Sequence, residues 1–232
     1  MSGLAWCYAG VAQHLGGRRV YGVQATGAGE LPGTLNALAE RYVDAVRIVQ
    51  PEGAYHLLGW SLGGTVAQEM AVALAESGAK VGSVVMLDTL PPERIPAIQA
   101  APTAGELFAE LGLTELEAPR VDLTFAQAAD EIRTRAHLDF VTAELLEAAS
   151  ERVEKLARMA SDHEPRSYRG VVDFVVAQRD VNRHRDLVER WSDRVASIRE
   201  HSVDATHAEM MAPSVLSQIF DLVRYGEDSD VT

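Results

Sequence analysis

A serine set between two glycines carries the strongest chemical signal in this sequence. Residues 59–63 read Gly-Trp-Ser-Leu-Gly, a G-x-S-x-G pentapeptide with Ser61 at its centre. The apolar run 55–58 before it predicts a buried strand, and the stretch 65–75 after it predicts a helix. A serine in a tight turn between a strand and a helix has a strained backbone and an exposed hydroxyl. The pattern therefore predicts a nucleophile elbow.

Acyl transfer at a serine also requires a base and an acid that orients the base. In α/β-hydrolases these groups follow the chain order serine, acid, histidine. Ser61, Asp88 and His207 have this order, and the last two each come just after a predicted strand. A neutral histidine can accept the serine proton, while a carboxylate at its other ring nitrogen fixes the tautomer. The backbone N–H of Leu62, at the expected helix start, is the predicted first oxyanion donor.

The sequence contains two candidates for the acid. Asp88 directly ends a strongly apolar strand and is followed by a turn at residues 91–92. Asp180 follows the next predicted strand and lies in the polar run 178–183. Many hydrolases have their acid after that later strand, which keeps Asp180 as the alternative. The residues favour Asp88, because it directly ends the apolar strand and precedes the turn.

Strands and helices alternate along most of the chain. The predicted strands lie at 19–25, 55–58, 81–87, 171–177 and 198–203, and the predicted helices at 3–15, 34–49, 65–75 and 214–225. Gly78 is the expected C-terminal cap of the helix after the elbow. This alternation is typical of an α/β fold with a mostly parallel sheet and helices on both faces.

The connection between Asp88 and the strand at residue 171 is about 80 residues long, far beyond the usual length. Segments 106–111, 125–140 and 142–159 within it have apolar residues at helical spacing. We therefore expect a helical lid at about residues 95–168, inserted over the carboxyl edge of the sheet. Together with the sheet it forms one predicted domain, residues 1–232.

Composition excludes several classes of function. The formal net charge is −13, which argues against binding to nucleic acid or to anionic membranes. The sequence has no apolar run of membrane-spanning length and no signal peptide at its start. A single cysteine, Cys7, allows no internal disulfide and fits a reducing compartment, so we expect a cytoplasmic location. The sequence lacks metal-ligand spacings and phosphate-binding loops, so no bound metal or cofactor is expected.

The elbow resembles a known family. Residues 55–67 read Tyr-His-Leu-Leu-Gly-Trp-Ser-Leu-Gly-Gly-Thr-Val-Ala. They are similar to the elbow of the thioesterase domains that end nonribosomal peptide synthetase and polyketide synthase assembly lines. Segments 20–24, 85–88 and 206–211 also match in order and spacing. The similarity covers nearly the whole chain, although the lid matches only in being helical.

The resemblance implies an α/β-hydrolase fold and supports Asp88 over Asp180 as the acid. It also implies a reaction in which Ser61 takes an acyl or peptidyl chain from the phosphopantetheine thiol of a carrier protein. Water, or a hydroxyl or amine of the chain itself, then releases the ester. The prosthetic arm belongs to the carrier partner and is not a bound cofactor. The alternatives are a stand-alone editing thioesterase and a catalytically weak domain that docks a carrier protein.

The start of the sequence departs from the family pattern. Members begin with an apolar strand and a His-Pro-Ala-Gly-Gly-like loop whose backbone supplies the second oxyanion donor. This sequence begins inside that loop at residues 1–6, so the first strand or strands of the family fold are expected to be missing. The backbone of Met1 falls where the second donor would be. Loss of one such donor lowers turnover roughly 100- to 1,000-fold, so a shortened start would weaken the activity.

Overall fold

The computed structural model describes residues 3–25, 31–95, 101–110, 123–136, 138–180 and 186–223. Its elements, in chain order, are η1 (Trp6–His14), α1 (Leu35–Val49), β1 (Tyr55–Trp60), α2 (Leu62–Glu76), β2 (Val81–Leu87), η2 (Pro92–Arg94), α3 (Ala104–Glu110), α4 (Phe125–Ala136), α5 (Ala143–Ser161), β3 (Tyr168–Ala177), α7 (Leu187–Ser192), β4 (Val195–Val203), η3 (His207–Glu209) and α8 (Pro213–Leu222). None of the helices in these ranges is both long enough and apolar enough to cross a bilayer.

The described strands form a parallel sheet in the order β1-β2-β3-β4. Trp60 lies opposite Leu87, and Leu87 lies opposite Val175, so the strands end together at one edge. Parallel neighbours require crossovers, which α2 provides between β1 and β2. The residues that follow β1, β2 and β4 are therefore brought to the same edge of the sheet, where ligands bind in open α/β folds.

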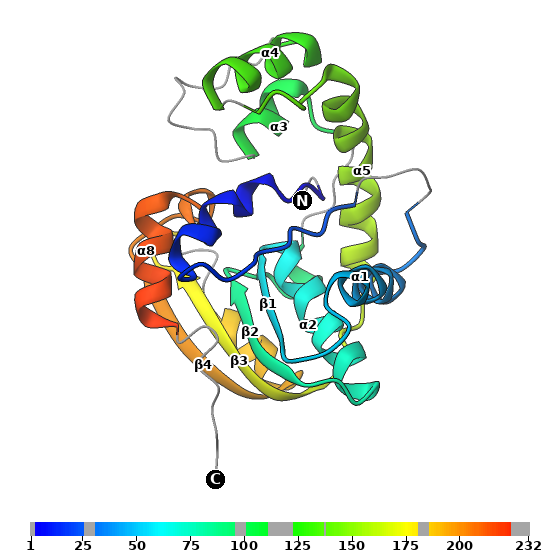
Figure 1. Cartoon of the computed structure of the whole chain (residues 1–232), viewed down its shortest axis with the longest axis vertical. Helices are drawn as coiled ribbons and strands as arrows, with labels where there is room; N and C mark the ends of the chain where they lie inside the picture. Colours follow the sequence, from blue (N-terminus) through cyan, green and yellow to red (C-terminus); the bar gives the residue numbers. More distant parts are fainter. Residues whose placement is uncertain are drawn as a thin grey trace.

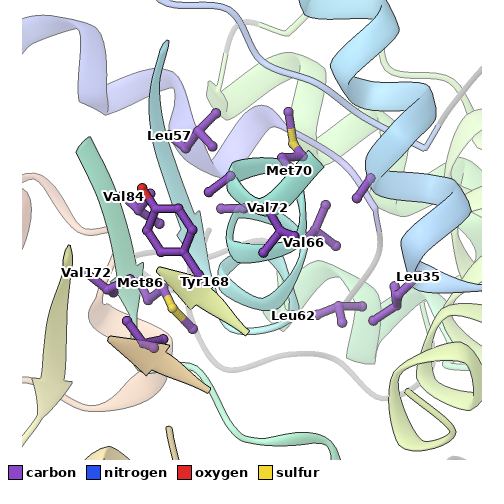
Figure 2. Packing of buried hydrophobic residues seen from close by; sticks show 14 of the residues in the cluster. Leu35, Leu57, Leu62, Val66, Met70, Val72, Val84, Met86, Tyr168 and Val172 are labelled. Carbon is purple, nitrogen blue, oxygen red and sulfur yellow. The ribbon is translucent and has the colours of Figure 1, made fainter. Parts of the chain in front are cut away.

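Helices cover both faces of the sheet (Figure 1). On one face, α2 packs over Leu57, Val84 and Met86, as Figure 2 shows, and α1 packs against α2. On the other face, η1 and α8 pack over Val85 and Leu87. Because alternate residues of β2 point into two different apolar layers, the strand is apolar at nearly every position. This is why the sequence shows a continuous apolar run at 81–87 and no alternation.

Helices α3, α4 and α5 form a separate small lobe with an apolar core of its own. In Figure 1 the N-terminal segment lies between α3 and α4 of this lobe and the sheet. Leu4 from that segment is buried in the core of the lobe. The three helices expected in the long connection are confirmed, with α4 ending at Ala136, earlier than the predicted end at residue 140.

Most of the predicted boundaries are close to the observed ones. Strand β2 matches the prediction at both ends, whereas β3 and β4 each begin three residues earlier than predicted, at Tyr168 and Val195. Thr34 caps α1 by accepting a hydrogen bond from the Ala37 N–H, and Gly78 takes the positive φ (79°) expected after α2. Helix α8 begins one residue before its prediction, and residues 224–225 lie outside the described part.

Two expectations near the N-terminus are wrong, and one helix before β4 was not predicted. The β-rich run 19–25 is not a strand, because its backbone forms no ladder with another described strand. The predicted amphipathic helix at 3–15 is a 3₁₀-helix, with i to i−3 bonds at Tyr8 and at Leu15 just after it. Helix α7 was not predicted, since its six residues are too few to show a periodic pattern.

A buried ion cluster joins α2 to the loop before β3. Glu69 is fully buried and accepts hydrogen bonds from His163 Nε2 (3.0 Å), the Arg166 backbone N–H (2.8 Å) and Arg166 Nε (2.7 Å). Burial raises the pKa of Glu69, but these hydrogen bonds outweigh burial and hold its pKa below the ordinary value. The cluster therefore fixes the end of α5 and the start of β3 against the helix that carries the elbow.

Glu69→Gln is expected to lower the free energy of unfolding by about 2–4 kcal/mol near pH 7, since one charge of a buried pair is lost. A lowered native pKa means that the carboxylate stabilises the fold above pH 4.5, its ordinary pKa, and that this stabilisation is lost as the pH falls through the native pKa. Urea unfolding at several pH values should therefore show the two proteins converging in acid. Glu76→Gln, which removes the exposed partner of the same arginine, should change stability little. Equal effects of the two substitutions would contradict the expectation.

Candidate active site

Ser61 has the backbone of a nucleophile elbow. It follows β1 directly, precedes α2 and has φ 57° and ψ −126°, a strained conformation for a residue with a side chain. Its N–H donates to the Leu87 carbonyl (2.9 Å), and its carbonyl accepts from the Gly64 N–H (2.9 Å). Its side chain makes no capping hydrogen bond to α2. The hydroxyl is therefore not used to cap the start of α2.

Asp88 lies at the end of the neighbouring strand and is fully buried. It also has a positive φ, 44°, and its N–H donates to the Val175 carbonyl (2.8 Å). Its Oδ1 accepts from the Ala177 N–H (3.2 Å) and its Oδ2 lies 2.6 Å from His207 Nδ1. Both carboxylate oxygens therefore have a donor, which offsets the cost of burying the charge.

The contact with Asp88 determines the tautomer of His207. An ionised carboxylate only accepts hydrogen bonds, so Nδ1 of His207 carries the proton of this 2.6 Å bond. In the neutral ring Nε2 is then unprotonated and can accept a proton. Ser61 and His207 line the same cavity, and His207 lies just after β4 at the start of η3. The structure thus brings together the three residues that the sequence analysis selected.

Asp180 takes a different position from the one that a catalytic acid needs. Its Oδ2 accepts a hydrogen bond from the backbone N–H of His207 (2.5 Å), whereas the ring nitrogen Nδ1 faces Asp88. The geometry therefore favours Asp88 as the partner of the ring, whereas Asp180 contacts the backbone of the loop that carries His207.

Of the two expected oxyanion donors, the structure describes Leu62. Leu62 is the first residue of α2, so its N–H has no acceptor within the helix and lies at the positive end of the helix dipole. Met1 lies outside the described residues.

A cavity of about 400 Å³ extends from Ser61 along β1. It contacts consecutive residues of β1, Tyr55 to Leu58, and consecutive residues of the segment 18–23. Since neighbouring residues of a strand point to opposite faces, a cavity that meets all of them must run along the strand edge. This is the edge of β1 away from β2, which pairs with no other strand of the described sheet. Its walls are mainly apolar and include Tyr42 of α1 and Met70 of α2.

Two aromatic residues pack against the elbow. Trp60 lines the cavity, and its ring centroid lies 5.1 Å from that of His207, so it adjoins the site as well as packing in the core. Tyr8 in η1 accepts a hydrogen bond from the Trp60 N–H (2.9 Å), and burial raises its pKa. The sequence analysis missed Tyr8, because no local pattern indicates that η1 packs against β1.

The fold and the site define a serine hydrolase of the α/β-hydrolase type, and comparison with known proteins identifies the family. Residues 1–223 match the family model of the thioesterase domain. The chain therefore belongs to the thioesterase domain family and is a serine hydrolase of the thioesterase type.

Relatives in sequence are much longer than this chain. It is 34% identical over 239 residues to a dimodular nonribosomal peptide synthase of Bacillus subtilis (strain 168), covering 94% of this chain and 10% of the relative. It is 31% identical over 222 residues to vanchrobactin synthetase VabF of Vibrio anguillarum, covering 94% of this chain and 7% of the relative. The chain thus spans a tenth or less of the length of these two relatives.

Solved structures show the same fold. The NocB thioesterase domain, in covalent complex with a fluorophosphonate nocardicin G analog, has a TM-score of 0.66 at 26% identity and covers 96% of this chain and 89% of its own. The Vlm2 thioesterase domain has a TM-score of 0.69 at 19% identity and covers 95% of this chain and 88% of its own. The expected α/β-hydrolase fold is confirmed by this likeness.

Proposed function

We propose that this chain releases an acyl or peptidyl chain from a thioester through an ester formed on Ser61. In the first step Nε2 of His207 takes the Ser61 proton as Oγ attacks the thioester carbonyl. The resulting oxyanion is held by the Leu62 N–H. The C–S bond then breaks, and the imidazolium returns the proton to the departing thiolate.

The second step regenerates the serine. His207 removes a proton from water, or from a hydroxyl or amine of the bound chain, and this oxygen or nitrogen attacks the ester carbonyl. The C–O bond to Ser61 breaks, the serine recovers its proton, and the product is an acid, a lactone or a lactam. The buried charge of Asp88 stabilises the imidazolium in both steps. The observation that carries the proposal is the 2.6 Å contact between Asp88 Oδ2 and His207 Nδ1, in a site whose cavity also contains Ser61.

The sequence relatives support a carrier protein as the partner. They are named as peptide synthases and synthetases, and this chain corresponds to a small share of each. We therefore propose that the thiol is the phosphopantetheine arm of a carrier domain, which is part of the substrate and not a cofactor of this chain. The match to a small part of long peptide synthetases favours chain release over a stand-alone editing role. A cytoplasmic location belongs to the same proposal, supported by the single Cys7.

The lobe of α3, α4 and α5 is proposed as the lid of this site. It corresponds to most of the region expected at about residues 95–168, and Leu156 of α5 lines the cavity beside residues of the elbow. A wall from α5 would shape the space for the acyl chain and limit the access of water to the ester.

A fluorophosphonate probe tests the proposed nucleophile. It should phosphonylate the wild-type protein once, on the peptide that contains Ser61, as found by mass spectrometry after digestion. Labelling should be absent in Ser61→Ala and strongly slowed in His207→Ala, because the hydroxyl is then without its base. His201→Ala is the matched control: His201 lies on β4 and bonds Asp173, so its loss should leave the labelling rate unchanged. A folded protein that does not label, or that labels at another serine, would refute the proposal.

A further inference from the structure

The end of β3 contributes no group to the proposed chemistry, yet it holds two of the three proposed catalytic residues. On one side, the Val175 carbonyl and the Ala177 N–H bond the backbone and the carboxylate of Asp88. On the other side, the N–H groups of Gln178 and Arg179 donate to the carbonyls of residues 203 and 205 (3.0 Å each), beside β4. The main chain thus continues to pair past the end of β3, as far as the loop that carries His207.

Asp180 is the last contact in this series. Its Oδ2 accepts from the His207 N–H at 2.5 Å, a short hydrogen bond to an ionised acceptor. His207 is therefore held at two points by two carboxylates, at its backbone by Asp180 and at its ring by Asp88. These two contacts restrict the movement of His207, and Nε2 is the ring nitrogen that does not face Asp88.

The rest of the loop is braced separately. Glu209 closes a capping box by accepting from the N–H and the hydroxyl of Thr206 (2.8 Å each), and it pairs with Arg179. Arg179 also bonds Asp204 (3.3 Å), which is largely exposed. These contacts hold the loop in place without reaching His207 itself. The His207 N–H donates to the Asp180 carboxylate, and the His207 carbonyl accepts a longer hydrogen bond from the Met210 N–H (3.4 Å).

We infer that Asp180 is a positioning residue for the reaction, because its carboxylate orients His207 through the backbone N–H. This inference rests on the proposed function. A base displaced by a fraction of an ångström accepts the serine proton less readily, and misplacement of about 1 Å lowers rates roughly 100-fold. Asp180 is not among the residues that line the cavity, so we expect its replacement to leave KM unchanged.

Steady-state hydrolysis of an acyl N-acetylcysteamine thioester tests the inference. Asp180→Ala should lower kcat about 10- to 100-fold with KM unchanged, because the acceptor of a charge-assisted hydrogen bond is removed. Asp180→Asn keeps a carbonyl oxygen for the same N–H and should retain most of the wild-type kcat. Asp204→Ala removes a carboxylate from the same loop and should behave as wild type. A wild-type kcat in a folded Asp180→Ala, or equal losses in Asp180→Ala and Asp180→Asn, would overturn the inference.

A second measurement does not depend on activity. In a ¹H–¹⁵N spectrum the His207 amide proton should lie downfield in wild type and Asp180→Asn and move upfield in Asp180→Ala. An unchanged amide resonance in Asp180→Ala would overturn the inference. Normal fluorophosphonate labelling in His207→Ala would instead refute the proposed function, so the two failures are distinguishable.

Discussion

Asp88→Asn should lower kcat about 10³- to 10⁴-fold while the protein stays folded. An asparagine can turn its amide toward Nδ1 of His207 and donate to it, which moves the ring proton to Nε2. A protonated Nε2 cannot accept the Ser61 proton, so the geometry survives while the base is lost. Asparagine tolerates the positive φ of 44° at this position, so the fold should not suffer. Thioester turnover, with circular dichroism as the check on folding, measures the effect.

Asp180→Asn is the matched comparison for this prediction. Both aspartates contact His207, one at the ring and the other at the backbone N–H. The backbone contact needs only an acceptor, which asparagine supplies, whereas the ring contact needs an acceptor that never donates. If Asp180→Asn proved nearly inactive and Asp88→Asn nearly normal, the acid would belong to the later strand and the present assignment would be wrong.

Gly59→Ala should destabilise the protein by more than about 3 kcal/mol, or prevent folding. A Cβ built at Gly59 would lie 1.9 Å from the carbonyl oxygen of Gly63 and 2.5 Å from the Gly64 backbone nitrogen. These are backbone atoms of the first turn of α2, so they cannot move aside as a flexible side chain would. Strand β1 and helix α2 would have to separate, and the elbow would lose its conformation. Urea unfolding and the yield of soluble protein measure the effect.

Gly33→Ala is the control for this substitution, because a Cβ at Gly33 would meet no atom of the described residues within 4 Å. It should leave stability nearly unchanged or raise it slightly, since alanine has fewer unfolded conformations than glycine. A stable and active Gly59→Ala protein would show that the elbow can relax, and would contradict the close approach seen here.

The local sequence predicted the structure correctly where the pattern lay within one helix or strand and the segments next to it. The continuous apolar run of β2 predicts a strand buried on both faces, and the observed bounds agree at both ends. The glycine spacing around Ser61 predicts the elbow, because only small residues allow strand and helix to approach so closely. Local pattern failed at residues 19–25, where β-rich residues form no ladder, because strand formation also requires a partner.

The sequence by itself determined which side chains could react, in what chain order, and at which edge of a parallel sheet they would meet. It did not determine which carboxylate faces the ring of His207, because Asp88 and Asp180 each follow a strand, β2 and β3, that ends at this edge of the sheet. Only the tertiary structure decided this, by placing Asp88 at Nδ1 and Asp180 at the backbone N–H. The physical reason is that strand register and loop path, which come from packing across the whole sheet, set distances of a few ångström that no local pattern encodes.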